Sequence, residues 1–309
     1  MIDFFDAIYS CKYNKFFNKI YFSKFIRFSI RIIANLFLPI YFILEKESYY
    51  KEKLKINFIV SITSFPSRIN NVHLVIESII RQDVNVANII LWLSRIEFNY
   101  QTLPKKLLKL NEKKVIEIRF VDDNIKSHKK YLYALTEFKN SIIITLDDDV
   151  FYKSNTISSL IKAHYKFPNC IICNSSYYTI YDNVEQYEKW EQTKYKDIPS
   201  YNNFFVGIGG VLYPPNSLHH NVMNTKDLSI FCMDADDIWL KINALMNKTK
   251  VIYTGYESYF LPVINTNNID LHLTNVNKNN NNLQIKNTRK YYINNYKTDP
   301  FILLNNYNE

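Results

Sequence analysis

The sequence is poor in glycine, which makes up only four of its 309 residues. A phosphate-binding loop of the Walker type needs glycines at fixed spacing, and neither that loop nor a G-x-G-x-x-G run occurs. Three of the four glycines fall within four positions, in the segment Asn203 to Pro215 (NFFVGIGGVLYPP). Glycines grouped in this way indicate that the backbone passes close to a ligand or to another strand.

Cysteine is equally scarce. The four cysteines, at positions 11, 170, 173 and 232, are too few for a disulfide framework in a chain of this length. Cys170 and Cys173 have C-x-x-C spacing, but they lie in an apolar run that is typical of a buried strand. Because no second pair or histidine cluster completes a zinc site, we favour a structural role over a metal or redox role.

The chain also has no apolar run long enough to predict a membrane span. In Phe25 to Leu44 the apolar part begins at Ile32 and is shorter than the roughly 20 residues that a span needs. No small-residue cleavage site follows, which argues against a signal peptide. Residues 1–55 hold ten Lys or Arg against five Asp or Glu, a charge of +5 out of the net +9.

These features predict that residues 15–44 form a basic amphipathic helix in the membrane interface, which places the protein on the inner, cytoplasmic face of the membrane. Packing of the same helix on the protein's own surface and a membrane span are the alternatives. A net charge of +9 favours an anionic partner. No basic run interleaves with stacking aromatic residues, so we expect no nucleic-acid partner.

From Lys55 onward, apolar strands alternate with amphipathic helices. The predicted strands are 56–62, 88–93, 115–121, 141–146, 170–173 and 251–254. The predicted helices are 71–82, 103–110 (with Pro104 in its first turn), 129–138, 156–167 and 234–246. The Asn-rich segment 274–288 predicts a mobile loop. This alternation is typical of an open, mostly parallel α/β sheet flanked by helices, here over 55–309, preceded by a helical extension over 1–54.

Ligands bind such sheets at the carboxyl ends of the strands. Three polar loops follow apolar strands there: Thr63–Arg68, Asp122–Asp123 and Asp147–Asp149. Three adjacent carboxylates repel one another, and a divalent cation removes that cost. In an extended chain Asp147 and Asp149 point to one side and Asp148 to the other, so the first two predict a Mg²⁺ or Mn²⁺ site. A solvated acidic turn is the alternative.

A second acidic group, Asp234, Asp236 and Asp237, lies at the start of a predicted helix. It could cap the helix dipole or supply a general base toward an acceptor hydroxyl. Lys130 and Arg68 could be solvated charges or cations for a diphosphate. His272 could be a further metal ligand, although a single histidine is more often structural or exposed.

The order of VSITSFPSR, IIITLDDDV, VGIGGVLYPP and ADDIWLK resembles that of bacterial glycosyltransferases of the GT-A fold, related to family 2. The resemblance covers roughly residues 55 to 260 and does not include the N-terminal extension. It implies a metal-dependent, inverting transfer of a sugar from a UDP-linked donor to a hydroxyl of a growing glycan or glycolipid.

The resemblance also implies roles for single residues. Asp237, or its neighbour Asp236, would be the catalytic base, and Asp147 and Asp149 would match the D-x-D motif, with Asp149 favoured as the direct ligand of Mn²⁺ or Mg²⁺. The donor nucleotide-sugar would be bound by Thr63, Ser64, Arg68, Asp122, Lys130, Asp147 and Asp148. The acceptor side would hold Gly209, Gly210 and Trp239. Two further hypotheses stay open: a metal-dependent nucleotidyltransferase or phosphohydrolase, and a Ca²⁺-binding membrane-surface protein without enzymatic activity.

Overall fold

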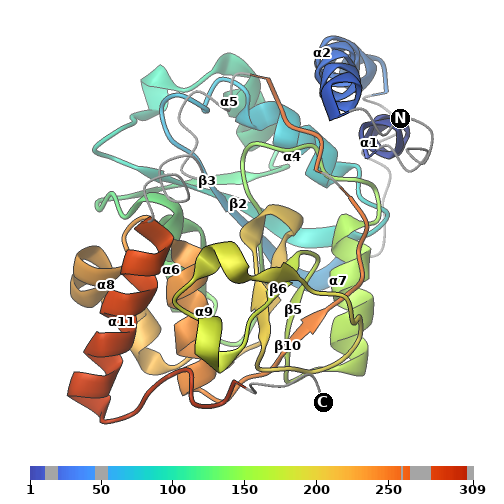
Figure 1. Ribbon diagram of the computed structural model, residues 1–309. Helices are drawn as coiled ribbons and strands as arrows, with labels where there is room; N and C mark the ends of the chain where they lie inside the picture. Colours follow the sequence, from blue (N-terminus) through green and yellow to red (C-terminus); the bar gives the residue numbers. More distant parts are fainter. Residues whose placement is uncertain (11–19, 46–54, 259, 265–279, 305–309) are drawn as a thin grey trace.

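The computed structural model describes residues 1–10, 20–45, 55–258, 260–264 and 280–304. Its centre is a seven-stranded sheet of order β10-β5-β9-β4-β1-β2-β3 (Figure 1). The strands are β1 Lys55–Thr63, β2 Asn85–Ser94, β3 Glu117–Val121, β4 Ile142–Thr145, β5 Ile171–Cys173, β9 Val211–Tyr213 and β10 Val251–Tyr253. Only β9 runs antiparallel to its neighbours in this sheet. The predicted open, mostly parallel α/β sheet is therefore confirmed.

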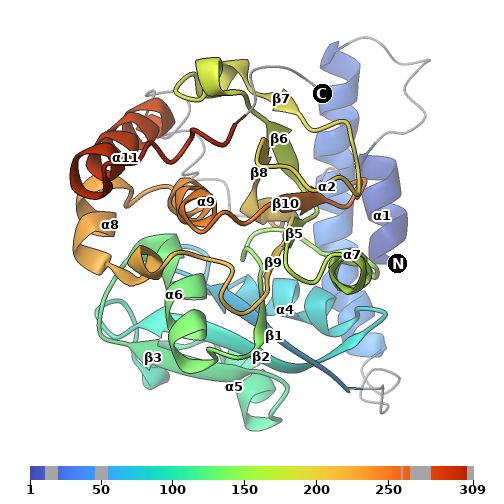
Figure 2. The same cartoon turned by 90° about the horizontal axis from the view of Figure 1, so that it is seen from below.

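Helices cover both faces of the sheet because the strands are apolar on both sides (Figure 2). Val60 and Ile62 of β1 belong to the core that includes α4, α5 and α7, whereas Ile59 belongs to a core on the α6 side. The helices of the main domain are α4 Val72–Ile80, α5 Lys105–Glu112, α6 Lys129–Glu137, α7 Thr156–Lys166, α8 Thr225–Phe231 and α9 Asp236–Met246. All except α8 were predicted to within a few residues, although Pro104 is the N-cap of α5 and precedes its first turn.

A small second sheet forms in the polar and aromatic segment after β5. It consists of β6 Ser176–Tyr178, β7 Glu191–Gln192 and β8 Asn203–Phe205, in the order β7-β6-β8. Short 3-10 turns complete the chain at 100–102, 126–128, 181–183, 187–189, 207–209 and 220–223. The sequence pattern carries few signals for β6, β7 and β8, because each is only two or three residues long.

Helix α11, Asn280–Tyr296, contradicts the loop predicted over 274–288, of which 274–279 lie outside the described residues. Asparagine has a low helix propensity, so this helix is stabilised by tertiary contacts. The side chains of Ile285 and Tyr292, two turns apart, are completely buried. Arg289 forms ion pairs with Asp299 and with Glu185, which tie the helix to the end of the chain and to the 181–189 region.

The N-terminal extension consists of α1 Ile2–Tyr9 and the 25-residue α2 Ile20–Leu44, which runs through Pro39 (Figure 2). One face of α2 packs on the domain, where Ala34 and Leu38 are completely buried. Asn35 donates to the Pro262 carbonyl at 3.0 Å and accepts from the Ile264 amide at 2.8 Å. Lys24–Leu44 is long and apolar enough to cross a membrane, so the apolar run alone underestimated the length of this helix.

Candidate active site

The three aspartates follow β4, where the chain bends at Asp148 and Asp149. Asp148 is buried and accepts hydrogen bonds from Ser64 Oγ at 2.6 Å and from Arg68 Nη1 at 2.8 Å. Asp149 pairs with the same Arg68 nitrogen at 3.0 Å, and Asp147 pairs with Lys130 at 2.7 Å. Because the chain bends, the side chains do not alternate as in an extended strand. Asp148 and Asp149 share one cation, and Asp147 has another.

The first predicted loop therefore lies beside the aspartates. Arg68 reaches Asp148 and Asp149 across 80 residues of sequence, because β1 and β4 are parallel neighbours whose carboxyl ends meet at one edge of the sheet. Thr63 donates its hydroxyl to the Trp92 carbonyl at 2.8 Å, which fixes it to β2. Burial raises the pKa of Asp148, against the lowering effect of Arg68 and Ser64.

Lys130 connects the two acidic groups. Its buried ammonium lies 2.7 Å from Asp147 Oδ1 and 2.9 Å from Asp236 Oδ2. Burial alone would lower the pKa of Lys130, but these carboxylates raise it well above its usual value. The lysine is therefore held charged between the end of β4 and the start of α9.

Gly207, which the sequence did not single out as a site residue, lies where these groups converge. Its amide donates to Asp237 Oδ2 at 3.0 Å. A Cβ added to Gly207 would lie 3.3 Å from each of Asp147 Oδ2, Asp237 Oδ1 and Lys130 Nζ. The side-chain-free face of this glycine is thus directed at the space between two carboxylates and an ammonium. The cluster of three glycines was the signal that could have identified it.

Asp236 and Asp237 are neighbours with opposite titration behaviour. Burial would raise the pKa of Asp236, but Lys130 and His128 lower it below its usual value. Burial and the neighbouring Asp236 raise the pKa of Asp237 to about 8. Two carboxylates whose environments separate their pKa values are typical of acid and base pairs in active sites. Asp237 has the affinity for a proton that a general base needs.

Two buried residues that were not predicted, Tyr152 and Ser61, form hydrogen bonds with the backbone of Asp147 and of Lys130. The Tyr152 hydroxyl accepts from the Asp147 amide at 2.7 Å and lies 3.2 Å from the Asp147 carbonyl. Ser61, on β1, hydrogen-bonds the Lys130 carbonyl and accepts from Trp92 Nε1 at 2.8 Å. Both positions are buried, so their sequence pattern was that of an ordinary core.

Four predicted site residues lie apart from this cluster. Trp239 is completely buried and donates its indole N–H to the Val222 carbonyl at 3.0 Å, so it belongs to the core and not to an acceptor surface. Gly209 and Gly210 pack against Asn174 and Leu146, and Gly210 has a φ of +86°. These two glycines let the backbone of β9 approach its neighbours. Asp122 is exposed and pairs with Arg95 at 3.1 Å, away from the other aspartates.

The metal prediction can be tested against the donor atoms. Within the described ranges, no group of three or more His, Cys, Asp or Glu side chains is placed to hold a metal, and His272 lies outside those ranges. Asp147 and Asp149 are each more than a quarter exposed, whereas Asp148 is nearly inaccessible. By exposure, Asp147 and Asp149 are accessible to a divalent cation that is held by one or two carboxylates together with substrate phosphates, whereas Asp148 is not. Cys170, Cys173 and Cys232 are free thiols.

The sequence matches no protein-family model and no curated protein. Among solved structures, the chain is similar to a mannosyltransferase from Pyrobaculum calidifontis in complex with GDP-Man and Mn²⁺, at 12% identity and a TM-score of 0.45, over 88% of this chain and 77% of that one. It is also similar to S. aureus TarS 1-349, at 10% identity and a TM-score of 0.41, over 65% of this chain and 59% of that one. A third is the UTP-bound UGPase from Acinetobacter baumannii, at 11% identity and a TM-score of 0.38, over 67% of this chain and 88% of that one. At such scores these matches do not assign an activity, which has to come from the protein's own residues.

Proposed function

We propose that this protein is a glycosyltransferase that moves a sugar from a nucleotide-sugar, UDP-linked, to a hydroxyl of an acceptor. The observation that carries the proposal is the convergence of Asp147, Lys130 and Asp237 around Gly207, at the carboxyl ends of the strands. Gly207 is therefore surrounded by an ammonium, a carboxylate and a second carboxylate with a high proton affinity. A sugar diphosphate needs a cation, and an acceptor hydroxyl needs a base.

In the proposed reaction the donor diphosphate lies between Arg68 and Lys130. These cations are held in place by the aspartates that they pair with, and a diphosphate that binds in exchange for those ion pairs has its leaving-group charge stabilised by them. Asp147 and Asp149 would hold Mn²⁺ or Mg²⁺, which offsets charge on the diphosphate oxygens when it is bound. Ser64 fixes Asp148 and through it Arg68, and Thr63 fixes the loop that carries them.

Asp237 completes the proposed reaction as the general base. Its carboxylate takes the proton of the acceptor hydroxyl while the acceptor oxygen bonds to the anomeric carbon. The bond from that carbon to the diphosphate oxygen breaks, and the nucleoside diphosphate leaves. A single displacement of this kind inverts the anomeric configuration. Asp236 is less suited to the role, because its carboxylate is engaged by Lys130.

We propose as acceptor a growing surface glycan or glycolipid, such as lipopolysaccharide, lipooligosaccharide or capsule, made at the inner face of the membrane. The N-terminal extension carries an excess of positive charge and includes helix α2, which lies beside the domain. Both features support this location.

The decisive experiment incubates the purified protein with single nucleotide-sugars and Mn²⁺ and measures release of the nucleoside diphosphate with and without acceptor glycans. Release of pyrophosphate or inorganic phosphate without a sugar acceptor would assign a nucleotidyltransferase or phosphohydrolase instead. A shift of the melting temperature by UDP, GDP or CMP together with Mn²⁺ screens for the donor, because a ligand stabilises the state that it binds. Stabilisation by Ca²⁺ alone, with no effect of any nucleotide, would favour a non-enzymatic protein.

A further inference from the structure

Helix α2 presents an apolar face to the outside of the molecule. Leu36, Ile40 and Ile43 recur at helical spacing and are 66%, 58% and 66% exposed. On the opposite face of the same helix, Leu38 and Ala34 are completely buried against the domain. Further exposed apolar side chains on α1 and α2 extend this face, namely Phe4, Ile8, Phe25, Phe28, Ile33, Phe37 and Leu44. Continuous apolar surface of this kind marks an interaction site.

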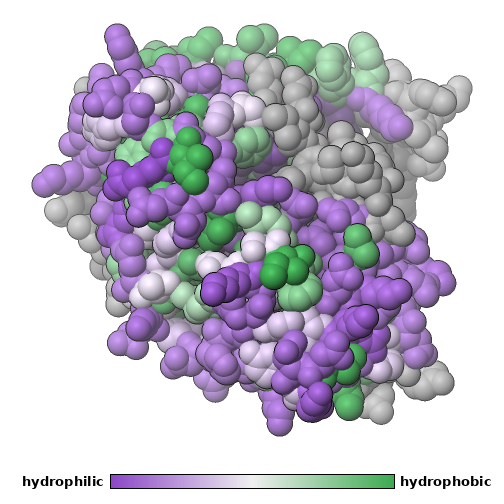
Figure 3. All heavy atoms as spheres, turned by 90° about the vertical axis from the view of Figure 1, so that its left-hand side faces the viewer, coloured by the Kyte–Doolittle hydropathy of each residue, from purple (hydrophilic) through white to green (hydrophobic). Residues whose placement is uncertain are grey.

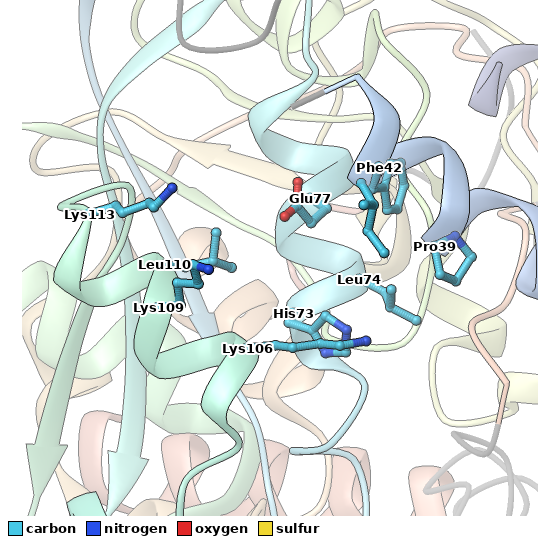
Figure 4. Close-up of a pocket in the computed structure, with 10 residues that line it drawn as sticks. Pro39, Phe42, His73, Leu74, Glu77, Lys106, Lys109, Leu110 and Lys113 are labelled. Carbon is cyan, nitrogen blue, oxygen red and sulfur yellow. The ribbon is translucent and has the colours of Figure 1, made fainter. Parts of the chain in front are cut away.

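A groove runs beside this face, between α2, α4 and α5 (Figure 4). Pro39 and Phe42 form its α2 side, and Leu74 of α4 lies between them and α5. The α5 side of the groove carries a row of three exposed lysines: Lys106, Lys109 and Lys113. Positions three and seven residues apart lie on one face of a helix, so their ammonium groups form a stripe along the groove. Lys105 and Lys114, at the two ends of the row, are also exposed.

We propose that α2 and α5 together form a docking surface for a lipid bilayer that contains anionic phospholipids. The outward face of α2 lies in the boundary between headgroups and acyl chains, and the α5 lysines face the lipid phosphates. This proposal goes beyond the sugar transfer and does not depend on it. It also adds α5, which is about 60 residues away from the helix whose sequence first suggested membrane contact.

Charge complementarity selects a bilayer as the partner. Apolar side chains on one helix and lysines on the next match the two layers of an anionic lipid surface, a hydrocarbon boundary below a plane of phosphates. Figure 3 shows the left-hand side of Figure 1, a face that is covered mainly by hydrophilic residues, with small hydrophobic patches within it and hydrophobic residues along its upper edge. Docking through α2 and α5 would therefore leave that hydrophilic face in water.

Burial on the domain selects an interfacial position over a span. A membrane-spanning α2 would have to leave the domain, which would expose the buried side of Leu38 and Ala34. It would also break the hydrogen bonds that Asn35 makes with Pro262 and Ile264. In the interface the helix keeps these contacts and buries only the face that the domain leaves open.

The test is flotation of the full chain with vesicles of neutral phosphatidylcholine and with vesicles that also contain phosphatidylglycerol. The wild type should bind the anionic vesicles, and added salt should weaken the binding. Replacing Lys106, Lys109 and Lys113 together by Gln should lower the partition coefficient onto anionic vesicles roughly 100-fold, about fivefold for each lysine. Replacing Leu36, Ile40 and Ile43 by Gln should lower it roughly tenfold or more.

The matched control replaces three exposed lysines of α8 and α11, Lys226, Lys286 and Lys290, by Gln. These helices lie on the side of the molecule away from α2 in both views (Figures 1 and 2). The control removes the same charge, so it should retain vesicle binding within about threefold. Circular dichroism of all variants confirms that they fold.

Three results would overturn the proposal. The first is a wild type that does not prefer anionic over neutral vesicles. The second is an α5 variant that binds as well as the α8 and α11 control. The third is a dimer in sedimentation analysis that the Leu36, Ile40 and Ile43 variant converts to a monomer, because it would assign the apolar face to a second copy of the chain.

Discussion

The acidic site and the α2–α5 face use charge in opposite ways. At the acidic site, Asp147 and Asp236 share Lys130, and Asp148 and Asp149 share Arg68. On the α2–α5 face, the lysines of α5 are exposed beside apolar side chains. The first arrangement pairs buried charges with one another inside the protein, whereas the second places its charged side chains in contact with water.

This difference determines how each surface can bind. A diphosphate or a metal at the acidic site must exchange with ion pairs that already exist, so binding there depends on geometry and is selective. A lipid surface that meets α5 finds lysines already in contact with water, and its binding depends on salt and on the number of charges. Substitutions at the first surface should therefore alter catalysis or folding, and substitutions at the second should alter partitioning alone.

The largest expected effect comes from Asp237→Asn. The amide has the same shape and its oxygen can still accept from the Gly207 amide, but it cannot take a proton. Sugar transfer should fall by a factor of about 10² to 10⁴, the range of general base catalysis, and the melting temperature should change little. Initial rates of nucleoside diphosphate release measure it. Asp234→Asn is the control, since Asp234 pairs with Lys126 outside the cluster. Equal rates for both variants would remove Asp237 from the mechanism.

A second prediction compares Lys130, which pairs with two carboxylates, with a buried lysine that pairs with a carbonyl group. Lys241, one turn after Asp237 on α9, is also completely buried, but it donates to the Tyr201 carbonyl at 2.8 Å. Burial lowers the pKa of Lys241 to about 7, from 10.5. Between about pH 7 and 10.5 the unfolded chain binds a proton that the folded protein does not. The stability that this lysine contributes is thus complete above pH 10.5 and is lost as the pH falls toward 7.

Lys241→Met removes this titration. The free energy of unfolding of the variant, relative to wild type, should therefore decrease by on the order of 3 kcal/mol between pH 7 and pH 10. Denaturant titrations at several pH values in that interval measure the difference. If the free energies of unfolding of the two proteins change with pH in parallel, Lys241 is charged in the folded protein at neutral pH. Burial would then not lower its pKa relative to that of Lys130.

The sequence predicted the fold where local pattern decides it. The apolar run 141–146 and the amphipathic run 71–82 became β4 and α4, because buried strands and half-buried helices impose their own periods on the chain. Strand β9 was missed, since three residues carry no period and its antiparallel direction follows from its pairing with β4 and β5. Helix α11 was missed because contacts such as Arg289 with Asp299 outweigh a poor local propensity.

The candidate site divides in the same way. Residue type and position, after a strand for Asp147 and at the start of a helix for Lys130 and Asp237, were enough to select three side chains that the structure brings together near Gly207. The choice of partners was not predictable, since Arg68 and Asp148 are 80 residues apart and the bend after β4 decides which aspartate faces which cation. Trp239 was assigned to the acceptor side, yet it continues the apolar face of α9 next to Ile238 and Ile242. That pattern indicated the core, where the structure places it.

Two leucines of α2 test whether this helix packs on the domain. Leu38 is completely buried against the domain, whereas Leu36, two residues away, is 66% exposed. Leu38→Ala should lower the free energy of unfolding by about 2 to 3 kcal/mol through the lost contacts and the cavity. Leu36→Ala should change it by less than about 0.5 kcal/mol. Equal, small effects in denaturant titrations would mean that α2 does not pack on the domain in solution.

The smallest expected effect separates the buried aspartate of the triplet from an exposed one. Asp148→Asn keeps the hydrogen bond from Ser64 but leaves Arg68 with Asp149 as its ion-pair partner, so the loss of stability should be about 1.5 kcal/mol. Asp122→Asn breaks a pair with Arg95 that water screens, and its effect should be close to zero. Thermal unfolding of both variants measures the contrast. If Asp148→Asn is as harmless as Asp122→Asn, the ion pairs of the acidic site are as weakly coupled to folding as surface charges. A ligand could then break these ion pairs at little cost in stability. The acidic site and the α2–α5 face would differ only in where their charges lie.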